Sequence, residues 1–408
     1  MSQKFITGLD IGSSSLKAAI GEIKNDGQIS LIKVIKTPSS GMRKGSVSDL
    51  SELTRSLNVM FSEIKKVSKE ALKNIYINVG SSDIRTQSSK GIVAVSRADN
   101  EIHQDDIDRA IQASQAINLG GNRMILHAII REYVIDGIGG IREPLGMTGT
   151  RLEVNSLIID AFGPGIKNLT KCVEMAGATF GGLFFSPLAN AESLLTKNQK
   201  DLGVALVDIG FGTTSLCVYE DGKLIHAAVF PVGSGNITND LAIGLKTSIN
   251  AAESIKLNFG AASTKGISGR ENIDLKKFDP GARSNVSRRS IIDIIEVRLA
   301  EIFEFVNNEL KLIGKDGQLP VGIILSGGGS KIPGIVDLAK DEFELPVQVG
   351  IPDSSILDMP DGELSLSIED PEYVCAVGLL LSGVKRLGNS TEPGFTAILK
   401  RMFRSLMP

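Results

Sequence analysis

The sequence of 408 residues predicts an α/β protein of at least two domains, built around an internal duplication. Two similar segments, LDIGSSSLK at 9–17 and VDIGFGTTS at 207–215, each follow apolar residues typical of a buried strand. A third glycine turn, SGGGS at 326–330, follows another such strand. The chain is longer than one hydrophobic core usually supports, which favours several domains.

The composition is that of an ordinary globular protein, with 42% hydrophobic and 22% charged residues. The net charge of −3 gives no reason to expect nucleic-acid binding. The cysteines and histidines are scattered without CxxC or HxxxH spacing, so we expect neither a disulfide nor a metal site made of protein ligands. No signal peptide and no apolar run of about 18 residues is present, so no membrane span is expected.

The first block of the chain predicts three strands, FITGLDIG, LKAAIGEI and ISLIKVIKT, within residues 4–36. A helix from Asp49 to about Ser68 follows, because its leucines, Met60 and Ile64 recur on one stripe. The strand at 74–80 closes this block.

Residues 81–163 change character and predict a small α+β insertion. Two alternating runs, KGIVAVS and RMILHAIIREYVI, flank a helix expected at 104–118, whose first turn carries aspartates that suit the helix dipole. A glycine-rich turn at Gly137–Gly140 leads into a last strand, RLEVNSLIIDA.

The rest of the chain repeats the opening plan. Residues 203–232 predict strand, turn, strand, Asp-Gly turn and strand, and 238–313 are mostly helical apart from a polar stretch at 263–288. The clearest helices are expected at 166–178, 187–195, 291–310 and 372–385. A linker-like segment, GNSTEPG, precedes a final helix.

The two D-x-G turns have the residues needed to hold phosphates. Backbone N–H groups around their glycines form an anion nest, and hydroxyls and one lysine add donors and charge. The expected contacts are Gly12, Ser13, Ser14, Ser15, Lys17, Gly210, Gly212, Thr213 and Thr214. Asp10 and Asp208 would repel the phosphates unless a cation intervenes, which predicts Mg²⁺ held through water. Either turn alone could be a plain hairpin turn, but the pair together with GGGS favours nucleotide binding.

These segments resemble the actin-like (ribonuclease H-like) ATPase fold shared by actin, sugar kinases and heat-shock chaperones. The two phosphate turns, the motif GGGSKIPG and two connecting helices stand in the expected order. The resemblance implies two lobes with ATP and Mg²⁺ bound in the cleft between them. It also implies contacts to adenosine and to the phosphates from the second lobe by Glu253, Lys256, Gly327, Gly328, Gly329, Ser330, Gly233, Gly235 and Asn236.

Along nearly its whole length, the sequence resembles the FtsA family of bacterial division actins. The phrases LGVALVDIGFGTT, ITNDLA, AAESIKLNFGAA and SRRSIIDIIEVRLAEIFEFV are typical of that family. The resemblance implies a lobe one core (1A) at 1–80, 164–201 and 372–387, with subdomain 1C inserted at 81–163. It implies a lobe two core (2A) at 202–237 and 314–371, with subdomain 2B at 238–313. A linker (388–394) and an amphipathic helix (395–407) would follow. A PilM-like pilus-assembly protein and a sugar-kinase-type phosphotransferase stay open as alternatives.

The terminal segment EPGFTAILKRMFRSLMP predicts a membrane-surface helix. Its apolar face comprises Phe395, Ile398, Leu399, Met402, Phe403 and Leu406, and cations project beside it at Lys400, Arg401 and Arg404. A helix of this length cannot cross a bilayer but can lie in an anionic membrane surface. The alternative is a helix packed on the parent domain.

Membership of the FtsA family implies a second partner, the C-terminal tail of FtsZ, docked on subdomain 2B. A basic cluster there suits an acidic, apolar peptide; it comprises Arg283, Arg288, Arg289 and Arg298, with Asn285 nearby. The alternative is ordinary surface helix charge. The resemblance further implies self-assembly into filaments, recruitment of later division proteins through 1C, and a place on the cytoplasmic face of the membrane at the division site.

Hydrolysis of ATP is expected to be slow at most. In several actin-like ATPases a Glu or Gln on the first connecting helix orients the attacking water, and Ser186 stands close to that place here. Glu192 is a weak candidate, because it lies further along the helix. Phe211 and Ser215 depart from the common DIGGGTTD pattern, and we expect Phe211 to point away from the phosphates.

Overall fold

The computed structural model describes residues 4–24, 28–268, 271–282, 285–352, 357–359, 364 and 368–388. The linker, the terminal helix with all its membrane-facing residues, and Arg283 lie outside these residues, so the predictions about them are not addressed by the fold.

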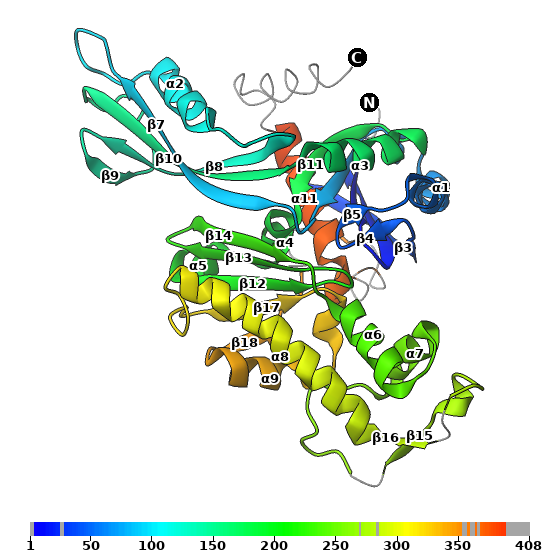
Figure 1. The fold of residues 1–408 in the computed structure, drawn as a ribbon. Helices are drawn as coiled ribbons and strands as arrows, with labels where there is room; N and C mark the ends of the chain where they lie inside the picture. The colour runs from blue at the N-terminus through cyan, green and yellow to red at the C-terminus, as the bar shows by residue number, and fades with distance from the viewer. Residues whose placement is uncertain are drawn as a thin grey trace.

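Lobe one is built on a five-stranded sheet of order β11-β6-β1-β2-β3. Its strands are β1 (Lys4–Ile11), β2 (Ser15–Ile23), β3 (Ile29–Pro38), β6 (Ile75–Val79) and β11 (Phe180–Phe185). Helices α1 (Leu50–Val67) and α3 (Gly163–Met175) cover one face, and α11 (Val374–Gly388) covers the other (Figure 1). The predicted stripe of α1 is buried, and Asp49 caps the helix by accepting a hydrogen bond from the Glu52 N–H.

The insertion forms a second, antiparallel sheet of order β7-β10-β8-β9 with helix α2 on one face. The elements are β7 (Arg85–Ala94), α2 (Gln104–Gln115), β8 (Arg123–Ile135), β9 (Ile138–Ile141) and β10 (Arg151–Phe162). The α+β insertion is confirmed, but two details of it differ from expectation. Helix α2 ends at Gln115, and the glycine-rich segment is the exposed edge strand β9, where one side faces solvent and glycine is tolerated.

Lobe two repeats the strand plan of lobe one in a sheet of order β14-β13-β12-β17-β18. Its strands are β12 (Val204–Ile209), β13 (Thr214–Glu220), β14 (Lys223–Phe230), β17 (Gly322–Ser326) and β18 (Val347–Val349). Helices α6 (Ser234–Leu245), α7 (Ile249–Phe259), α8 (Arg288–Leu312) and α9 (Ile335–Phe343) complete the lobe, with a small hairpin of β15 (Asn272–Asp274) and β16 (Asn285–Ser287). The equivalent sheets explain why the two phosphate turns look alike in sequence.

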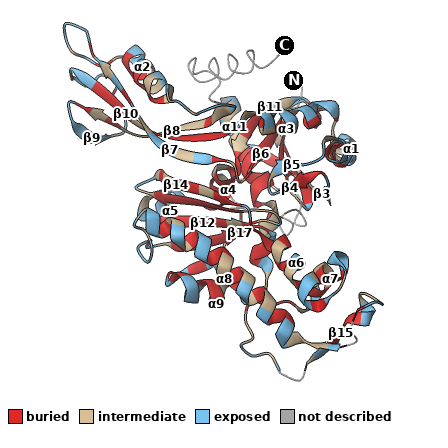
Figure 2. Ribbon diagram, viewed as in Figure 1, coloured by how far each residue is buried: buried red, intermediate tan, exposed pale blue. Residues whose placement is uncertain are grey.

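Helix α4 (Ser186–Leu194) lies between the two sheets and packs on α11 (Figure 1). The helices cross closely, because a side chain at Gly378 would overlap the carbonyl of Ala189. Buried residues are concentrated in both sheets and in these two helices (Figure 2). Helices α4 and α11 therefore form a buried layer at the junction of the two lobes.

The chain returns to lobe one earlier than the resemblance implies. Ser30 and Asp358 form a parallel bridge, and the Leu31 N–H donates to the Asp358 carbonyl at 2.8 Å. Leu357 and Ile368 join the apolar cluster of lobe one. Residues 357–359 and 368, assigned above to the lobe two core, thus pack in lobe one.

Strand β8 of the insertion touches both lobes. The Phe185 N–H donates to Nε2 of His127 at 3.0 Å, one residue before α4 begins. Burial, followed by the charge of Arg386, lowers the pKa of His127 to about 4, so its ring is neutral and can accept this bond. Arg131 donates from Nε to the Leu224 carbonyl at 3.1 Å and from its guanidinium to the Ile225 carbonyl, both on β14.

Among the described residues, no helix combines the length and the apolar character needed to cross a bilayer.

Candidate nucleotide-binding site

A cleft of about 470 Å³ opens between the two lobes. The β1–β2 turn and the start of α4 line it from lobe one, and the β12–β13 turn, Gly327–Gly329 and α7 line it from lobe two. The segment that enters α11 closes its floor. This volume falls in the range of small-molecule sites in proteins.

Asp10 ends β1 and is held by groups of its own lobe. The amide of Asn78 donates to the Asp10 carboxylate at 2.8 Å, while its oxygen accepts the Ile11 N–H at 2.7 Å. Lys17 pairs with Asp10 at 3.3 Å. Burial alone would lower the pKa of Lys17, but Asp10 and Glu372 outweigh it and raise that pKa, so the lysine is a permanent cation in the cleft.

Asp208 ends β12 in the other lobe, and its carboxylate accepts a hydrogen bond from the Asn190 amide on α4. Burial, with the negative charge of Asp10 second, raises the pKa of Asp208 to about 6. Gly327, with φ +80°, lies so close that a side chain there would overlap the carboxylate. Asp208 is therefore tightly enclosed beside a second carboxylate.

The two phosphate turns face each other across the cleft. A Cβ added to Gly212 would lie 2.7 Å from Oγ of Ser13, and one added to Gly12 would lie 2.7 Å from the Ser15 carbonyl oxygen. Glycine is therefore required at position 212 for the two turns to approach this closely, and at position 12 for the first turn to close on itself.

Most residues predicted from sequence do line this cleft: Asp10, Gly12, Ser13, Ser14, Ser15, Lys17, Asp208, Gly210, Gly212, Thr213, Glu253, Lys256, Gly327, Gly328 and Gly329. Thr214 and Ser330 do not. Thr214 is completely buried behind the turn, and the Ser330 hydroxyl donates to the Gly327 carbonyl at 2.7 Å.

Gly233, Gly235 and Asn236 do not line the cleft either, which corrects their expected approach to the phosphates. The first N–H groups of α6 are already used, because Ser234 donates to the Gly210 carbonyl at 2.9 Å and Gly235 to the Phe211 carbonyl at 2.8 Å. This segment supports the second phosphate turn from behind.

Phe211 is directed towards α6 and α7. Lys256 Nζ lies 5.7 Å from the centroid of its ring, and a Cβ on Gly235 would lie 2.7 Å from the ring. Lys256 is buried and bonds to Glu253 at 2.7 Å and to the Thr238 hydroxyl at 2.9 Å. Leu257, Ile332 and Pro333 add an apolar wall on this side of the cleft.

The sequence reasoning missed several residues that line or support the cleft, among them Lys36, Asn78, Asn190, Lys331, Glu372 and Cys375. Glu372, just before α11, accepts a hydrogen bond from Lys331 of lobe two at 3.2 Å and also pairs with Lys36 on β3. These ion pairs connect the two lobes at the entry to α11. Apart from Lys331, which lies within GGGSKIPG, none of these residues belongs to a motif singled out in the sequence. Only their three-dimensional positions identify them.

Glu192 lies outside the cleft and pairs with Lys385 of α11. Ser186 does line the cleft, with its hydroxyl 3.4 Å from the Asn78 amide. Among the described residues, α4 therefore places no carboxylate in the cleft.

The residues fit a divalent cation on two grounds. Two carboxylates from different lobes lie close enough that one raises the pKa of the other, a conflict that a cation between them would remove. The oxygen of the buried Asn190 amide also has no hydrogen-bond partner. Asp10 and Asp208 would hold such a cation, which when bound neutralises phosphate charge.

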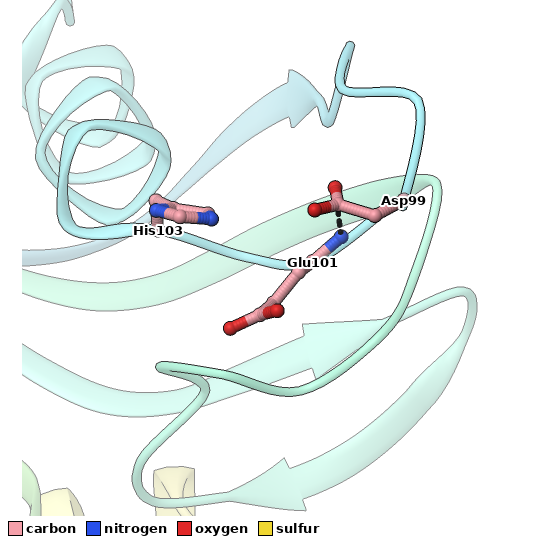
Figure 3. Close-up of side chains that lie close together, drawn as sticks. All are labelled: Asp99, Glu101 and His103. Carbon is pink, nitrogen blue, oxygen red and sulfur yellow. Dashed lines mark hydrogen bonds between the residues drawn. The ribbon is translucent and has the colours of Figure 1, made fainter.

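A separate group of three possible metal ligands occurs in the insertion. Asp99, Glu101 and His103 place ligand atoms within 4.8 Å of one another on the segment before α2 (Figure 3). Both carboxylates are exposed, and one bonds to the backbone, since Asp99 accepts from the Glu101 N–H at 3.1 Å. Exposed groups of this kind are common without an ion, and we assign no site here.

The predicted basic cluster of subdomain 2B is partly engaged within the protein. Arg288 donates to the Phe259 carbonyl at 3.0 Å and to Glu271 at 3.1 Å. Arg298 forms a two-pronged pair with Asp240 at 2.6 and 3.0 Å. Asn285 and Arg289 are exposed.

Comparison with protein families matches two parts of the chain. Residues 205–378 match the family described as cell division protein FtsA, and residues 81–160 match the SHS2 domain inserted in FtsA. The chain is 34% identical to the cell division protein FtsA of Pseudomonas aeruginosa over 385 residues, 94% of this chain and 90% of that protein. It is also 34% identical to the FtsA of Bacillus subtilis, over 91% of this chain and 82% of that protein.

Solved structures share the fold at low sequence identity. PilM in the PilM–PilN type IV pilus biogenesis complex has a TM-score of 0.67 and 18% identity, over 93% of this chain and 98% of that chain. MreB5 of Spiroplasma citri bound to ADP has a TM-score of 0.55 and 14% identity, over 95% of this chain and 99% of that chain. These neighbours establish the actin-like fold.

The enclosed Asp208 carboxylate predicts a pH-dependent stability. Because its folded pKa of about 6 lies above its usual value, it destabilises the metal-free protein above that pH and ceases to do so as the pH falls towards 4. We expect Asp208→Asn to raise the unfolding temperature in EDTA at about pH 7.5 by roughly 3 °C or more. At about pH 4.5 the two proteins should converge.

Differential scanning fluorimetry measures this effect. The same variant should lose the stabilisation that Mg-ATP gives the wild type, whereas Glu192→Gln, outside the cleft, should keep it. An Asp208→Asn protein that matches the wild type at both pH values would contradict the enclosed-charge account.

Proposed function

The chain belongs to the FtsA family of cell division proteins, and on this premise we propose that it is an ATP-dependent filament-forming adaptor at the division site. ATP with Mg²⁺ occupies the cleft between the lobes. Protomers polymerise on the cytoplasmic face of the membrane, tether FtsZ filaments there, and recruit later division proteins through the insertion.

The observation that carries this proposal is the pair of facing glycine turns, each preceded by an aspartate, that line one cleft. Backbone N–H groups, hydroxyls and Lys17 supply anion-binding groups, and Asp10 and Asp208 supply a cation site. Within the described residues, the absence of a cleft carboxylate on α4 supports a protein that holds ATP and hydrolyses it slowly at most. No observation favours a sugar-kinase reaction.

The membrane part of the proposal rests on the terminal sequence. Its apolar face and neighbouring cations suit the surface of an anionic bilayer. One such helix binds weakly, and a filament multiplies the attachment because linked helices act at high effective concentration. Membrane binding should therefore increase with ATP-dependent assembly.

The FtsZ part of the proposal concerns subdomain 2B. Arg288 pairs with Glu271 and Arg298 pairs with Asp240, so both arginines stabilise the local structure in addition to contributing positive charge. Arg289 and Asn285 are exposed beside them and are the groups best placed to meet an acidic tail.

Membrane binding is predicted to depend on the terminal helix. We expect the full chain to pellet with anionic liposomes in Mg-ATP, and a truncation at residue 390 to remain in solution. Phe403→Glu, on the apolar face, should weaken binding about tenfold because it replaces a buried aromatic by a charge. Ala397→Glu adds the same charge on the opposite side of the helix and is the control. Equal pelleting of full-length and truncated protein would refute the tether.

Charge reversal at Arg289 should weaken binding of an FtsZ-tail peptide about tenfold in fluorescence anisotropy, because the exposed cation would repel the acidic peptide. Lys311→Glu makes the same reversal near the other end of α8, about 33 Å away, and should have no effect. Arg288→Glu is a poorer test, because it also disrupts the contacts with Glu271 and Phe259. If Arg289→Glu binds ATP and keeps the wild-type affinity for the peptide, the proposed docking surface around Arg289 is wrong.

A further inference from the structure

Asn190 lies at the meeting point of the two lobes. It belongs to α4 of lobe one and is completely buried, and its amide N–H donates to the carboxylate of Asp208 on β12 of lobe two. The neighbouring Ser193 hydroxyl bonds to the Asn190 backbone carbonyl, whereas the side-chain amide meets Asp208, a residue that lines the cleft. Nothing in the sequence motifs of the two phosphate turns points to this residue.

The other half of the Asn190 amide has no partner within the described part of the chain, where its Oδ1 is buried and unbonded. The opposite orientation of the amide would place Oδ1 against the Asp208 oxygen, two acceptors facing each other, so Asp208 fixes the orientation that leaves Oδ1 free. A buried carbonyl oxygen without a donor is unfavourable, and native proteins rarely leave one.

Asn78 makes the comparison sharper. The Asn78 amide donates to the Asp10 carboxylate at 2.8 Å, just as the Asn190 amide donates to the Asp208 carboxylate. The Asn78 oxygen already accepts the Ile11 N–H at 2.7 Å, so this amide is satisfied by the protein alone. Asn190 differs in keeping one acceptor for a donor that comes from outside the chain.

We propose that Asn190 is a positioning residue of the cation site, which orients Asp208 through its N–H and accepts through Oδ1 a hydrogen bond from water on the divalent cation. Mg²⁺ usually keeps several of its waters, and these waters are donors only. This inference rests on the proposed nucleotide binding and adds the residue that fixes the hydration shell of the metal.

The position of Asn190 has a consequence for the lobes. Its donor group crosses from α4 to β12, so the cation site is complete only when these elements are in contact.

The test measures the affinity of the full chain for the fluorescent analogue mant-ATP, in excess MgCl₂ and in EDTA. The ratio of the two dissociation constants is the magnesium dependence. Asn190→Ala should reduce this ratio about tenfold, since a hydrogen bond to a charged assembly is lost. Its affinity in EDTA should stay within about twofold of the wild type, because no proposed phosphate contact is removed.

Two further variants separate this role from packing. Asn190→Asp keeps the shape and an acceptor oxygen but loses the donor, so its magnesium dependence should equal or exceed that of the wild type, with lower stability in EDTA. Ser193→Ala removes a buried hydroxyl from the same helix and should leave the ratio unchanged. A residue that only fills space would lower affinity equally with and without magnesium.

The outcomes are distinguishable. Absence of mant-ATP binding by the wild type would overturn the proposed function itself. Wild-type binding that needs magnesium, with an unchanged ratio in Asn190→Ala, would overturn only the role of Asn190. If Asn190→Ala does not fold, the Asn190→Asp ratio decides, and a value below that of the wild type contradicts the proposal.

Discussion

Asp10 and Asp208 lie near the ends of the central strands of two equivalent sheets, and the fold brings these like charges together in one cleft. Much of the surrounding structure compensates for that proximity. Lys17 neutralises one carboxylate, Asn78 and Asn190 orient the pair, and glycines let the turns approach without steric overlap. Such a pair destabilises the protein unless a cation joins it. A cation between the two carboxylates would remove this repulsion, and that expectation underlies the proposed site for a metal-bound nucleotide.

The inserted subdomain is connected to this site through strand β8. His127 accepts the backbone N–H of Phe185, which immediately precedes the helix that carries Asn190. Arg131, further along the same strand, holds two carbonyls of the edge strand β14 in lobe two. His127 and Arg131 thus connect strand β8 to lobe one and to lobe two, respectively. A partner that moves the insertion would strain these bonds, and so would a change in the angle between the lobes.

Most of the fold could be predicted because its elements carry local signals. Buried strands that end in Asp-x-Gly, and the apolar stripe of α1, depend on neighbouring residues in the chain. The remainder depends on distant contacts. Asn78 and Asn190 are single amides in apolar stretches, and only the fold shows which carboxylates they meet. The resemblance placed Gly233, Gly235 and Asn236 near the phosphates, and only the fold shows that carbonyls of the second phosphate turn already occupy the first N–H groups of α6.

The claim that one cation joins the two lobes at Asp10 and Asp208 is tested most directly by a crystal structure with ATP and Mn²⁺. Manganese scatters anomalously, so its position can be read independently of the nucleotide density. The account predicts one peak between these two carboxylates, with the phosphates lying against both glycine turns. A peak confined to Asp99, Glu101 and His103, or a nucleotide bound outside the cleft, would contradict it.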